Sequence, residues 1–425
     1  MPSIKIVLNE MEEIDMRLKY KKICLITIQY PPSWGGVARS SERLVKYLRS
    51  EGADVDVVIP MNIDKKMLQA ESRQIHLTEI SESWSVDKYG ARIFTVPIYP
   101  NEQQMSKLIE LMQLMDYRNH YDLYHGFWLP FAYPALIVSS RLNAPVIASI
   151  RGNDAVEWIG LPTYLPFIQA VLYKADWVTS VCSNLLSNVA SIEKIDDRSS
   201  VILNGIDKTG FPQWSYNNCS VGSVGYVGEL RYKKGISFLI NAFSRITFNN
   251  RQLRLTGSYK SEAEKNHTFD LIERLGIGTE CLHLGTLERK ELLEEISTLN
   301  VFVICSLHDG LPNGLLEAAA CGVPIVATRV AGMADVLSHE VNCLLVEPGN
   351  SLELAAAISR LLQNKELCNK LSAGALLLAE SLNEEQEKRS WLNLYLKLIE
   401  KRESSAIDSP FVKGEKILDA SEVCI

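Results

Sequence analysis

Short apolar runs alternate with amphipathic stretches along nearly the whole chain of 425 residues. This alternation is typical of βα units, in which parallel strands are joined by crossover helices. Parallel strands are buried on both faces of their sheet, so helices must cover both faces. The pattern therefore predicts an α/β protein built from doubly wound sheets. The length is enough for two or three domains, each with a hydrophobic core of its own.

The apolar runs form two series, separated by a polar break that begins at residues 204–207. The first series predicts strands at residues 23–28, 55–59, 93–96, 146–150 and 177–181. The second series predicts strands at residues 224–227, 253–255, 282–284, 301–305, 325–327 and 343–346. Amphipathic stretches suited to helices lie between these runs, so each series is expected to form a lobe.

The polar break sets the expected domain boundaries. We expect an N-terminal lobe at residues 1–207, with an extension at 1–21, and a C-terminal lobe at residues 222–383. The remaining segments are a linker at 208–221, an amphipathic helix at 384–402 and a flexible tail at 403–425.

Composition excludes several classes of protein. The chain has 44 Lys and Arg against 51 Asp and Glu, a net charge of -7, which argues against nucleic-acid binding as its main task. It contains no apolar run long enough for a membrane-spanning helix and no signal-peptide pattern. The nine cysteines are scattered and form no CxxC pair, so we expect reduced thiols, no metal site and a cytoplasmic location.

The segment at residues 306–331 is the most informative part of the sequence. An apolar strand leads into a Pro-Asn-Gly turn, which opens a helix beginning near Asn313. The first turn of a helix has unpaired backbone N–H groups and the positive end of the helix dipole. Asn313, Gly314 and Leu315 are therefore candidates for binding phosphate or sugar oxygens.

Two carboxylates flank this helix start. Asp309 precedes the helix, and Glu317 lies one turn inside it, so both carboxylates can face a ligand at the carboxyl end of the strand. For an isolated pair, a helix cap and a solvated surface charge would be the simpler interpretation. The neighbouring Gly310 and Gly314, which permit close backbone approach, favour a binding site instead.

This segment resembles the acidic signature of the retaining glycosyltransferases of family 4, in which two Glu residues are separated by seven others. Glu317 matches the second Glu, and the small residues that follow it match as well; Asp309 occupies the first position, one methylene shorter. The resemblance implies that Asp309 contacts the sugar of the donor and that Glu317 binds the hydroxyls of its ribose.

A second motif lies at residues 228–235, GELRYKKG. It resembles the family's G-R-L-x-x-x-K-G loop, whose cations hold the diphosphate of the donor. Gly228 and Lys234 match this loop, whereas Glu229 stands at the position of the Arg. We expect Arg231, two residues later, to supply the missing cation. A merely solvated loop would explain the charges but not the flanking glycines.

Further matches lie in the first lobe. The loop containing Gly35 and Gly36 is similar to the family's glycine-rich first loop, which lies against the donor phosphate and the acceptor. His125 ends a short strand, as in the family. Arg151 and Asp154 occupy an H-G-x-D motif in which Arg replaces His. The resemblance assigns His125, Arg151 and Asp154 to contacts with the acceptor or the donor sugar.

The resemblance covers roughly residues 23–400 and implies the GT-B fold, with two Rossmann-like lobes, an interlobe cleft and a terminal helix at 384–402 returning to the first lobe. It also implies transfer of a sugar, with retention, from a nucleotide diphosphate sugar to a hydroxyl of a glycan or lipid-linked acceptor in polysaccharide or glycoconjugate biosynthesis. Lys234 and Arg231 would stabilise the leaving diphosphate without a metal or other cofactor.

Two alternatives remain open at this point. An inactive GT-B protein that binds nucleotide sugars or acts as a scaffold would account for the replacements at Glu229, Arg151 and Asp309. A sugar-nucleotide 2-epimerase would share the two lobes, but the match around Glu317 disfavours it.

One amphipathic stretch suggests a membrane contact. Residues 37–49 carry four cations, which would let a helix rest on the anionic inner face of a membrane. An ordinary helix that packs on the sheet and exposes a basic face to water explains the same pattern. The four cations are Arg39, Arg43, Lys46 and Arg49.

Overall fold

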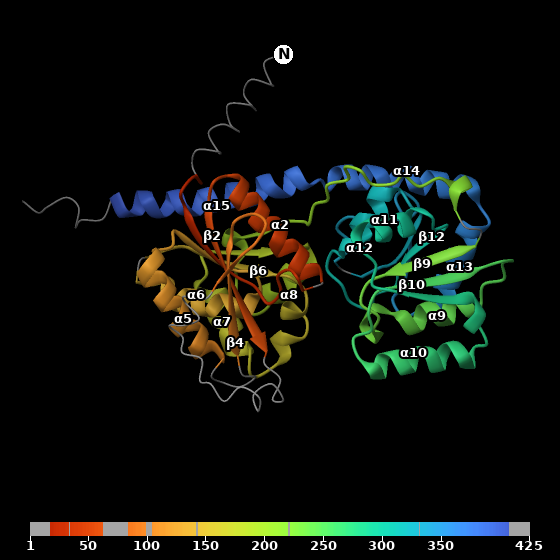
Figure 1. Ribbon diagram of the computed structural model, residues 1–425, viewed down its shortest axis with the longest axis horizontal. Helices are drawn as coiled ribbons and strands as arrows, with labels where there is room; N and C mark the ends of the chain where they lie inside the picture. Colours follow the sequence, from red (N-terminus) through yellow and green to blue (C-terminus); the bar gives the residue numbers. More distant parts are fainter. Residues whose placement is uncertain are drawn as a thin grey trace, which may run out of the picture. The chain divides into compact units, whose positions relative to one another are not determined.

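The computed structural model describes residues 18–33, 35–62, 84–98, 104–141, 143–219, 222–330 and 332–407. The described chain divides into two compact units (Figure 1). Unit 1 takes its residues from Met1–Thr179, Val189–Ser200 and Lys388–Ile425, and unit 2 takes its residues from Ser180–Asn188 and Val201–Glu387.

The first sheet has eight strands in the order β3-β4-β2-β1-β5-β6-β7-β8. β1 pairs in parallel with β2 and β5, whereas the short edge strand β3 is antiparallel to β4. The strands are β1 (Lys22–Ile26), β2 (Asp54–Asn62), β3 (Ser85–Val86), β4 (Arg92–Ile98), β5 (Leu123–Gly126), β6 (Val146–Ile150), β7 (Trp177–Ser180) and β8 (Ser199–Val201). The helices described between these strands are α2 (Gly36–Ser50), α5 (Gln104–Asn119), α6 (Ala132–Ser139), α7 (Leu165–Lys174) and α8 (Ser183–Ala190).

The second sheet has six parallel strands in the order β11-β10-β9-β12-β13-β14. They are β9 (Ser223–Val227), β10 (Gln252–Thr256), β11 (Cys281–Gly285), β12 (Val301–Ile304), β13 (Ile325–Thr328) and β14 (Leu344–Val346). The helices are α9 (Ile236–Ser244), α10 (Glu262–Arg274), α11 (Arg289–Ser297), α12 (Asn313–Cys321), α13 (Ser351–Leu362) and α14 (Lys365–Ser381).

Helices cover both faces of the second sheet (Figure 1). Successive residues of β12 point to opposite faces, as the two-residue period of a strand requires. Val301 and Val303 join the core cluster with α9, α10 and α13, whereas Phe302 and Ile304 join the cluster with α11 and α12. This arrangement explains why β12 is apolar at every position, and it confirms the predicted doubly wound α/β fold.

The terminal helix α15 (Glu384–Ile407) is longer than predicted. The flexible tail was expected from residue 403, but the helix continues to Ile407. Lys21 binds Glu403 at 2.6 Å, and Arg402 lies 3.7 Å from Asp122. The predicted extension before residue 18 and the tail beyond residue 407 lie outside the described residues. Among the described helices, none has the length and apolarity needed to cross a membrane.

Candidate functional site

The predicted donor residues lie at the centre of the second sheet. From β9 the chain proceeds outward to β10 and β11, then returns to place β12 on the other side of β9. In open α/β sheets, ligands bind beyond the carboxyl ends of the strands at such a reversal. The loop at residues 228–235 follows β9, and the loop at 305–312 follows β12 and opens α12. The two most informative sequence motifs therefore meet at the expected edge.

Gly235 brings these two loops into contact. Its φ is 76°, and an added Cβ atom would lie 1.8 Å from the carbonyl oxygen of Cys305. No other residue fits at this position without moving the backbone. The contact is reinforced by a hydrogen bond of 2.9 Å from the Leu307 N–H to the Lys233 carbonyl. As a result, Lys234 lies directly beside the loop that carries Asp309.

Lys234 and Asp309 form the central ion pair of the site. The ammonium lies 2.5 Å from Oδ2 of Asp309, with both side chains about one-fifth exposed. Ser306 donates its hydroxyl to the same oxygen at 3.1 Å, and the Gly310 N–H donates to Oδ1 at 3.0 Å. The carboxylate is therefore fixed in orientation by groups from its own loop. The sequence prediction that these two residues share one site is consistent with this geometry.

Arg231 has a partner that the sequence did not reveal. Its Nε lies 3.0 Å from Oε2 of Glu229, the residue that replaces the family Arg. Lys260, from the loop after β10, approaches the other oxygen of Glu229 at 3.6 Å. Gly257, directly after β10, allows this loop to lie close, since an added Cβ on Gly257 would meet the Gly228 carbonyl at 2.0 Å. Glu229 is therefore balanced by two cations.

The start of α12 has no side-chain cap. The Leu315 N–H donates to the Pro312 carbonyl at 3.0 Å, and the Leu315 side chain is fully buried in the core. Any ligand contact at Leu315 must therefore involve its backbone. Gly314 packs closely on the end of β9, where an added Cβ would lie 3.3 Å from the Val227 carbonyl. Asn313 is the first helical residue and is partly exposed.

Glu317 is almost wholly buried, with 2 % of its surface exposed. Arg289, the first residue of α11, places NH1 3.3 Å from Oε1 of Glu317. The sequence reasoning missed Arg289. One signal was present: the first turn of a helix favours acidic side chains, so a cation at its first position is unusual.

In unit 1, His125 is fully buried. Its Nδ1 lies 2.6 Å from the Tyr395 hydroxyl, and its Nε2 lies 2.6 Å from the Ser149 hydroxyl. Burial, with a smaller contribution from Arg151, lowers the pKa of the imidazole well below its ordinary value. A neutral, enclosed ring of this kind favours a structural role. The predicted substrate contact of His125 stays a prediction.

Asp154 is also fully buried. It accepts hydrogen bonds from the backbone N–H groups of Leu129, Arg151 and Gly152 at 2.7–3.1 Å. Burial raises its pKa, and these three donors oppose the change. Asp154 therefore shapes the loop after β6. Arg151 itself is partly exposed and lies over the Phe127 ring at 4.3 Å.

The glycine-rich loop of unit 1 is only partly described, since Trp34 lies outside the described residues. Gly35 has a φ of 151°, and an added Cβ would lie 2.7 Å from Oε1 of Gln29. Gly36 is the first residue of α2 and is exposed. The structure therefore shows why glycine is needed at position 35, and the predicted donor contact of the loop stays a prediction.

The predicted basic face of α2 is only partly exposed to solvent. Between positions 37 and 49 every residue is buried or only partly exposed, including the four cations. Arg49 binds the carbonyls of Ala53 and Tyr89 and lies 3.3 Å from Asp54. The amphipathic pattern was correct, but the helix uses its cations within the chain because it packs deeply against unit 1. This placement weakens the case for a membrane contact at α2.

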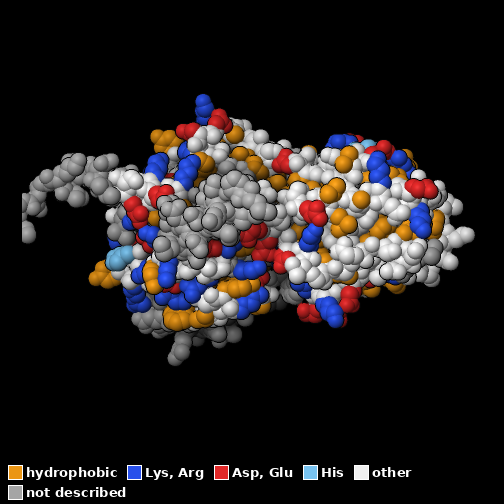
Figure 2. Space-filling model, turned by 90° about the horizontal axis from the view of Figure 1, so that it is seen from above, with side chains coloured by type: hydrophobic (Ala, Val, Ile, Leu, Met, Phe, Trp, Pro, Cys, Tyr) orange, Lys and Arg blue, Asp and Glu red, His pale blue; other side chains and the backbone are white. Residues whose placement is uncertain are grey.

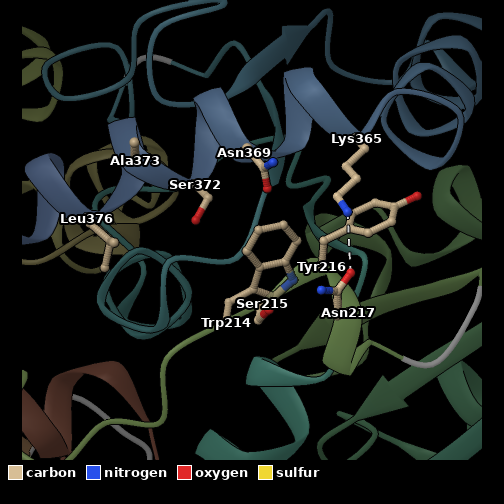
Figure 3. Close-up of a pocket in the computed structure, with 9 residues that line it drawn as sticks. All are labelled: Trp214, Ser215, Tyr216, Asn217, Lys365, Asn369, Ser372, Ala373 and Leu376. Atoms are coloured by element: carbon tan, nitrogen blue, oxygen red, sulfur yellow. Dashed lines mark hydrogen bonds between the residues drawn. The ribbon is translucent and has the colours of Figure 1, made fainter.

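A pocket of about 390 Å³ lies elsewhere in unit 2, between α14 and residues 214–217 (Figure 3). In it, Lys365 donates to the Asn217 amide oxygen at 3.3 Å and lies 5.1 Å from the centre of the Tyr216 ring. None of the predicted site residues lines this pocket.

Among the described residues, no group of three or more His, Cys, Asp or Glu side chains is arranged to hold a metal ion. The face seen in Figure 2 carries basic and acidic side chains interspersed.

Comparisons with known proteins match both halves of the chain. The model for glycosyltransferase family 4 matches residues 34–209, and the model for glycosyl transferases group 1 matches residues 222–376. An uncharacterized glycosyltransferase of Methanocaldococcus jannaschii is 26% identical over 370 residues, which are 81% of this chain and 89% of that protein.

Two solved structures show the same fold. Sucrose-phosphate synthase of Thermosynechococcus elongatus superposes with a TM-score of 0.75 at 20% identity, covering 90% of this chain and 100% of that chain. Anabaena HepE, solved in complex with UDP-glucose, gives a TM-score of 0.69 at 17% identity over 91% and 100% of the two chains. These likenesses assign the GT-B fold. The two family models, which together match most of the chain, show that it belongs to glycosyltransferase family 4 and is a retaining enzyme that transfers a sugar from a nucleotide sugar in glycan or glycoconjugate biosynthesis.

Proposed function

We propose that unit 2 binds the nucleotide diphosphate sugar through the site at the carboxyl ends of β9 and β12. The observation that carries this proposal is the ion pair between Lys234 and Asp309, at the reversal point of the sheet and beside the start of α12. In this proposal Lys234 binds the diphosphate, Asp309 accepts hydrogen bonds from the sugar hydroxyls, and Glu317 accepts them from the ribose.

The diphosphate gains negative charge as the bond to the sugar breaks. A fixed cation that is largely shielded from water stabilises this charge more strongly than a solvated one. Lys234 meets this requirement because its side chain is only 20% exposed and its ammonium is already held by Asp309. The backbone N–H groups of Asn313 and Gly314, at the positive end of α12, add to the stabilisation.

Arg231 contributes a second cation to this end of the site. Arg231 and Lys260 together carry two positive charges against the single negative charge of Glu229. The group therefore keeps one net positive charge where the family has its Arg. We infer that Arg231 reaches the diphosphate while Glu229 holds its guanidinium in place.

The acceptor is a hydroxyl of a glycan or of a lipid-linked glycan in this proposal. Arg151, partly exposed at the end of β6, suits an acceptor or donor group that carries a carboxylate or phosphate. His125 and Asp154 support the loop around it. A cytoplasmic location agrees with the use of a nucleotide sugar. A membrane contact through α2 would have to use cations whose side chains are partly buried.

The donor is best tested by calorimetry. HepE was solved with UDP-glucose, so UDP and UDP-glucose are the first ligands, followed by GDP and its sugar conjugates. We expect one nucleotide to bind the wild-type protein and to bind at least tenfold more weakly to Lys234→Ala. Lys365→Ala is the matched control, since this exposed lysine of α14 lines the pocket beside residues 214–217 and not the proposed donor site. Equal loss in both variants, or unchanged affinity in Lys234→Ala, would contradict the proposal.

A further inference from the structure

Arg289 makes an unusual pair with Glu317. The carboxylate lies on a side chain that is 3% exposed, whereas the guanidinium lies on one that is 54% exposed. A buried carboxylate is costly unless a cation or several donors face it. Arg289 meets this need from the solvent side, from a different helix. Its guanidinium also lies 5.5 Å from the centre of the Phe211 ring, a contact that further orients it.

The position of Arg289 in the fold is unfavourable on local grounds. It is the first residue of α11, at the positive end of the helix dipole, where acidic side chains are preferred. The same helix start already carries a capping box made by Glu288 and Glu291. Arg289 therefore contributes nothing to the cap. The contact that accounts for its presence is the one with Glu317, made possible because α11 and α12 pack against each other.

We propose that Arg289 is a positioning residue for recognition of the donor's ribose. Its guanidinium holds the Glu317 carboxylate in one orientation, so that the carboxylate is ready to accept hydrogen bonds from the ribose hydroxyls. This inference rests on the proposed role of Glu317. Selectivity for ribose over deoxyribose then depends on Arg289, a residue of α11 that lies outside both sequence motifs.

A purely structural role predicts something different. If Arg289 only stabilised the packing of α11 on α12, its loss would lower the thermal stability and would weaken all nucleotides equally. If it positions Glu317, its loss removes the advantage of a nucleotide that carries the 2′-hydroxyl. The ratio of two affinities therefore separates the two roles, because effects on stability cancel in it.

The experiment measures dissociation constants for UDP, GDP and ADP and for their 2′-deoxy counterparts. For the nucleotide that binds, we expect the wild-type protein to prefer the ribose form about tenfold, as one hydrogen bond to a charged group allows. In Arg289→Ala we expect this preference to fall below about twofold. Arg289→Lys, which keeps the charge but loses the planar fork, should be intermediate.

The controls distinguish the proposed role of Arg289 from the proposed role of Glu317. Glu317→Gln should also lose the preference, and adding Arg289→Ala to it should change the ratio no further. Lys290→Ala, an exposed lysine on the same helix, should leave the ratio unchanged. If the Ala variant does not fold, Arg289→Gln replaces it. A wild-type ratio in Arg289→Ala overturns this inference alone, whereas a wild-type ratio in Glu317→Gln overturns the proposed role of Glu317.

Discussion

The candidate site residues of the two units differ in the groups that surround them. In unit 1, His125 and Asp154 are fully buried, and their polar atoms bind groups of the protein itself. In unit 2, Asp309 and Glu317 face lysine and arginine side chains that are themselves partly exposed. A ligand can replace or join a partly exposed cation, but it cannot reach an enclosed histidine. This contrast agrees with a scaffold role for the first pair and with the proposed donor-binding role for the second pair.

The largest expected effect comes from Asp309→Asn. Loss of the carboxylate removes the proposed sugar contact, so kcat/KM should fall by about 100-fold. The affinity for UDP alone should stay equal or rise, because Lys234 loses its internal partner. Steady-state kinetics and calorimetry on the same preparation measure both quantities. A parallel loss of turnover and UDP affinity would mean that Asp309 supports the nucleotide, not the sugar.

His125→Ala should lower the stability of the protein and leave its activity largely unchanged, whereas Asp309→Asn should lower the activity. Removing a buried ring leaves a cavity and removes the hydrogen bonds to the Tyr395 and Ser149 hydroxyls, of which Ser149 keeps its bond to Thr179. The free energy of unfolding should therefore fall by about 2–4 kcal/mol. Denaturant unfolding followed by circular dichroism measures this change. The folded fraction should keep its kcat/KM within about tenfold. A collapse of activity at unchanged stability would place His125 in the substrate site and break the comparison.

The pH dependence of stability gives a smaller effect with a defined sign. The pKa of His125 is lowered in the folded chain, so below its ordinary value of 6.5 the unfolded chain binds a proton that the folded chain does not. Stability is therefore full above about pH 6.5 and decreases as the pH falls toward the folded pKa. Between pH 7.5 and 5.5 the wild-type protein should lose about 1 kcal/mol more than His125→Gln.

The difference between the wild-type protein and His125→Gln isolates the contribution of His125 from that of Asp154. Burial raises the pKa of Asp154. Protonation of Asp154 favours the folded chain and so acts in the opposite direction. Asp154 is present in both proteins, so its contribution cancels in the difference between them. Equal pH slopes for the wild-type protein and His125→Gln would show that the histidine titrates normally and is therefore reached by water.

Glu229→Gln should give the smallest effect. Removing one carboxylate leaves Arg231 and Lys260 without their shared partner, which raises the positive potential at the proposed diphosphate site. Because Glu229 is 37% exposed, solvent screens the gain. We expect UDP to bind about two- to fivefold more tightly at low salt, with less difference at high salt. Weaker binding would show that Glu229 is needed to hold Arg231.

The sequence was sufficient to predict the features that depend on residues close together in the chain, such as strands, helices and short motifs. The α/β fold follows from the apolar runs. Lys234 and Asp309 were assigned to one site by the resemblance of their motifs to those of the family, since two other strands separate β9 from β12 in the sequence. The short edge strands β3 and β8 were missed because runs of two or three residues show no usable period.

Contacts between distant elements could not be predicted in this way. His125 is enclosed by Tyr395, which is 270 positions away in the sequence, and no local pattern indicates what covers the end of a strand. Arg289 meets Glu317 only because two helices pack together. Glu403 of α15 pairs with Lys21, which lies near the start of the described chain. In each case the missing information is which surfaces become neighbours after folding.

The burial of α12 has a consequence for how this enzyme can change. The seven residues from Leu315 to Cys321 are all buried, and they include Glu317. A helix that serves both as core and, in the proposed function, as a ligand contact cannot vary freely, because most substitutions there would unfold unit 2 before altering its donor preference. New donor specificities should therefore arise by mutation in the loops after β9 and β10 and at the start of α11. Libraries aimed at changing the donor will retain more folded members if they leave α12 untouched.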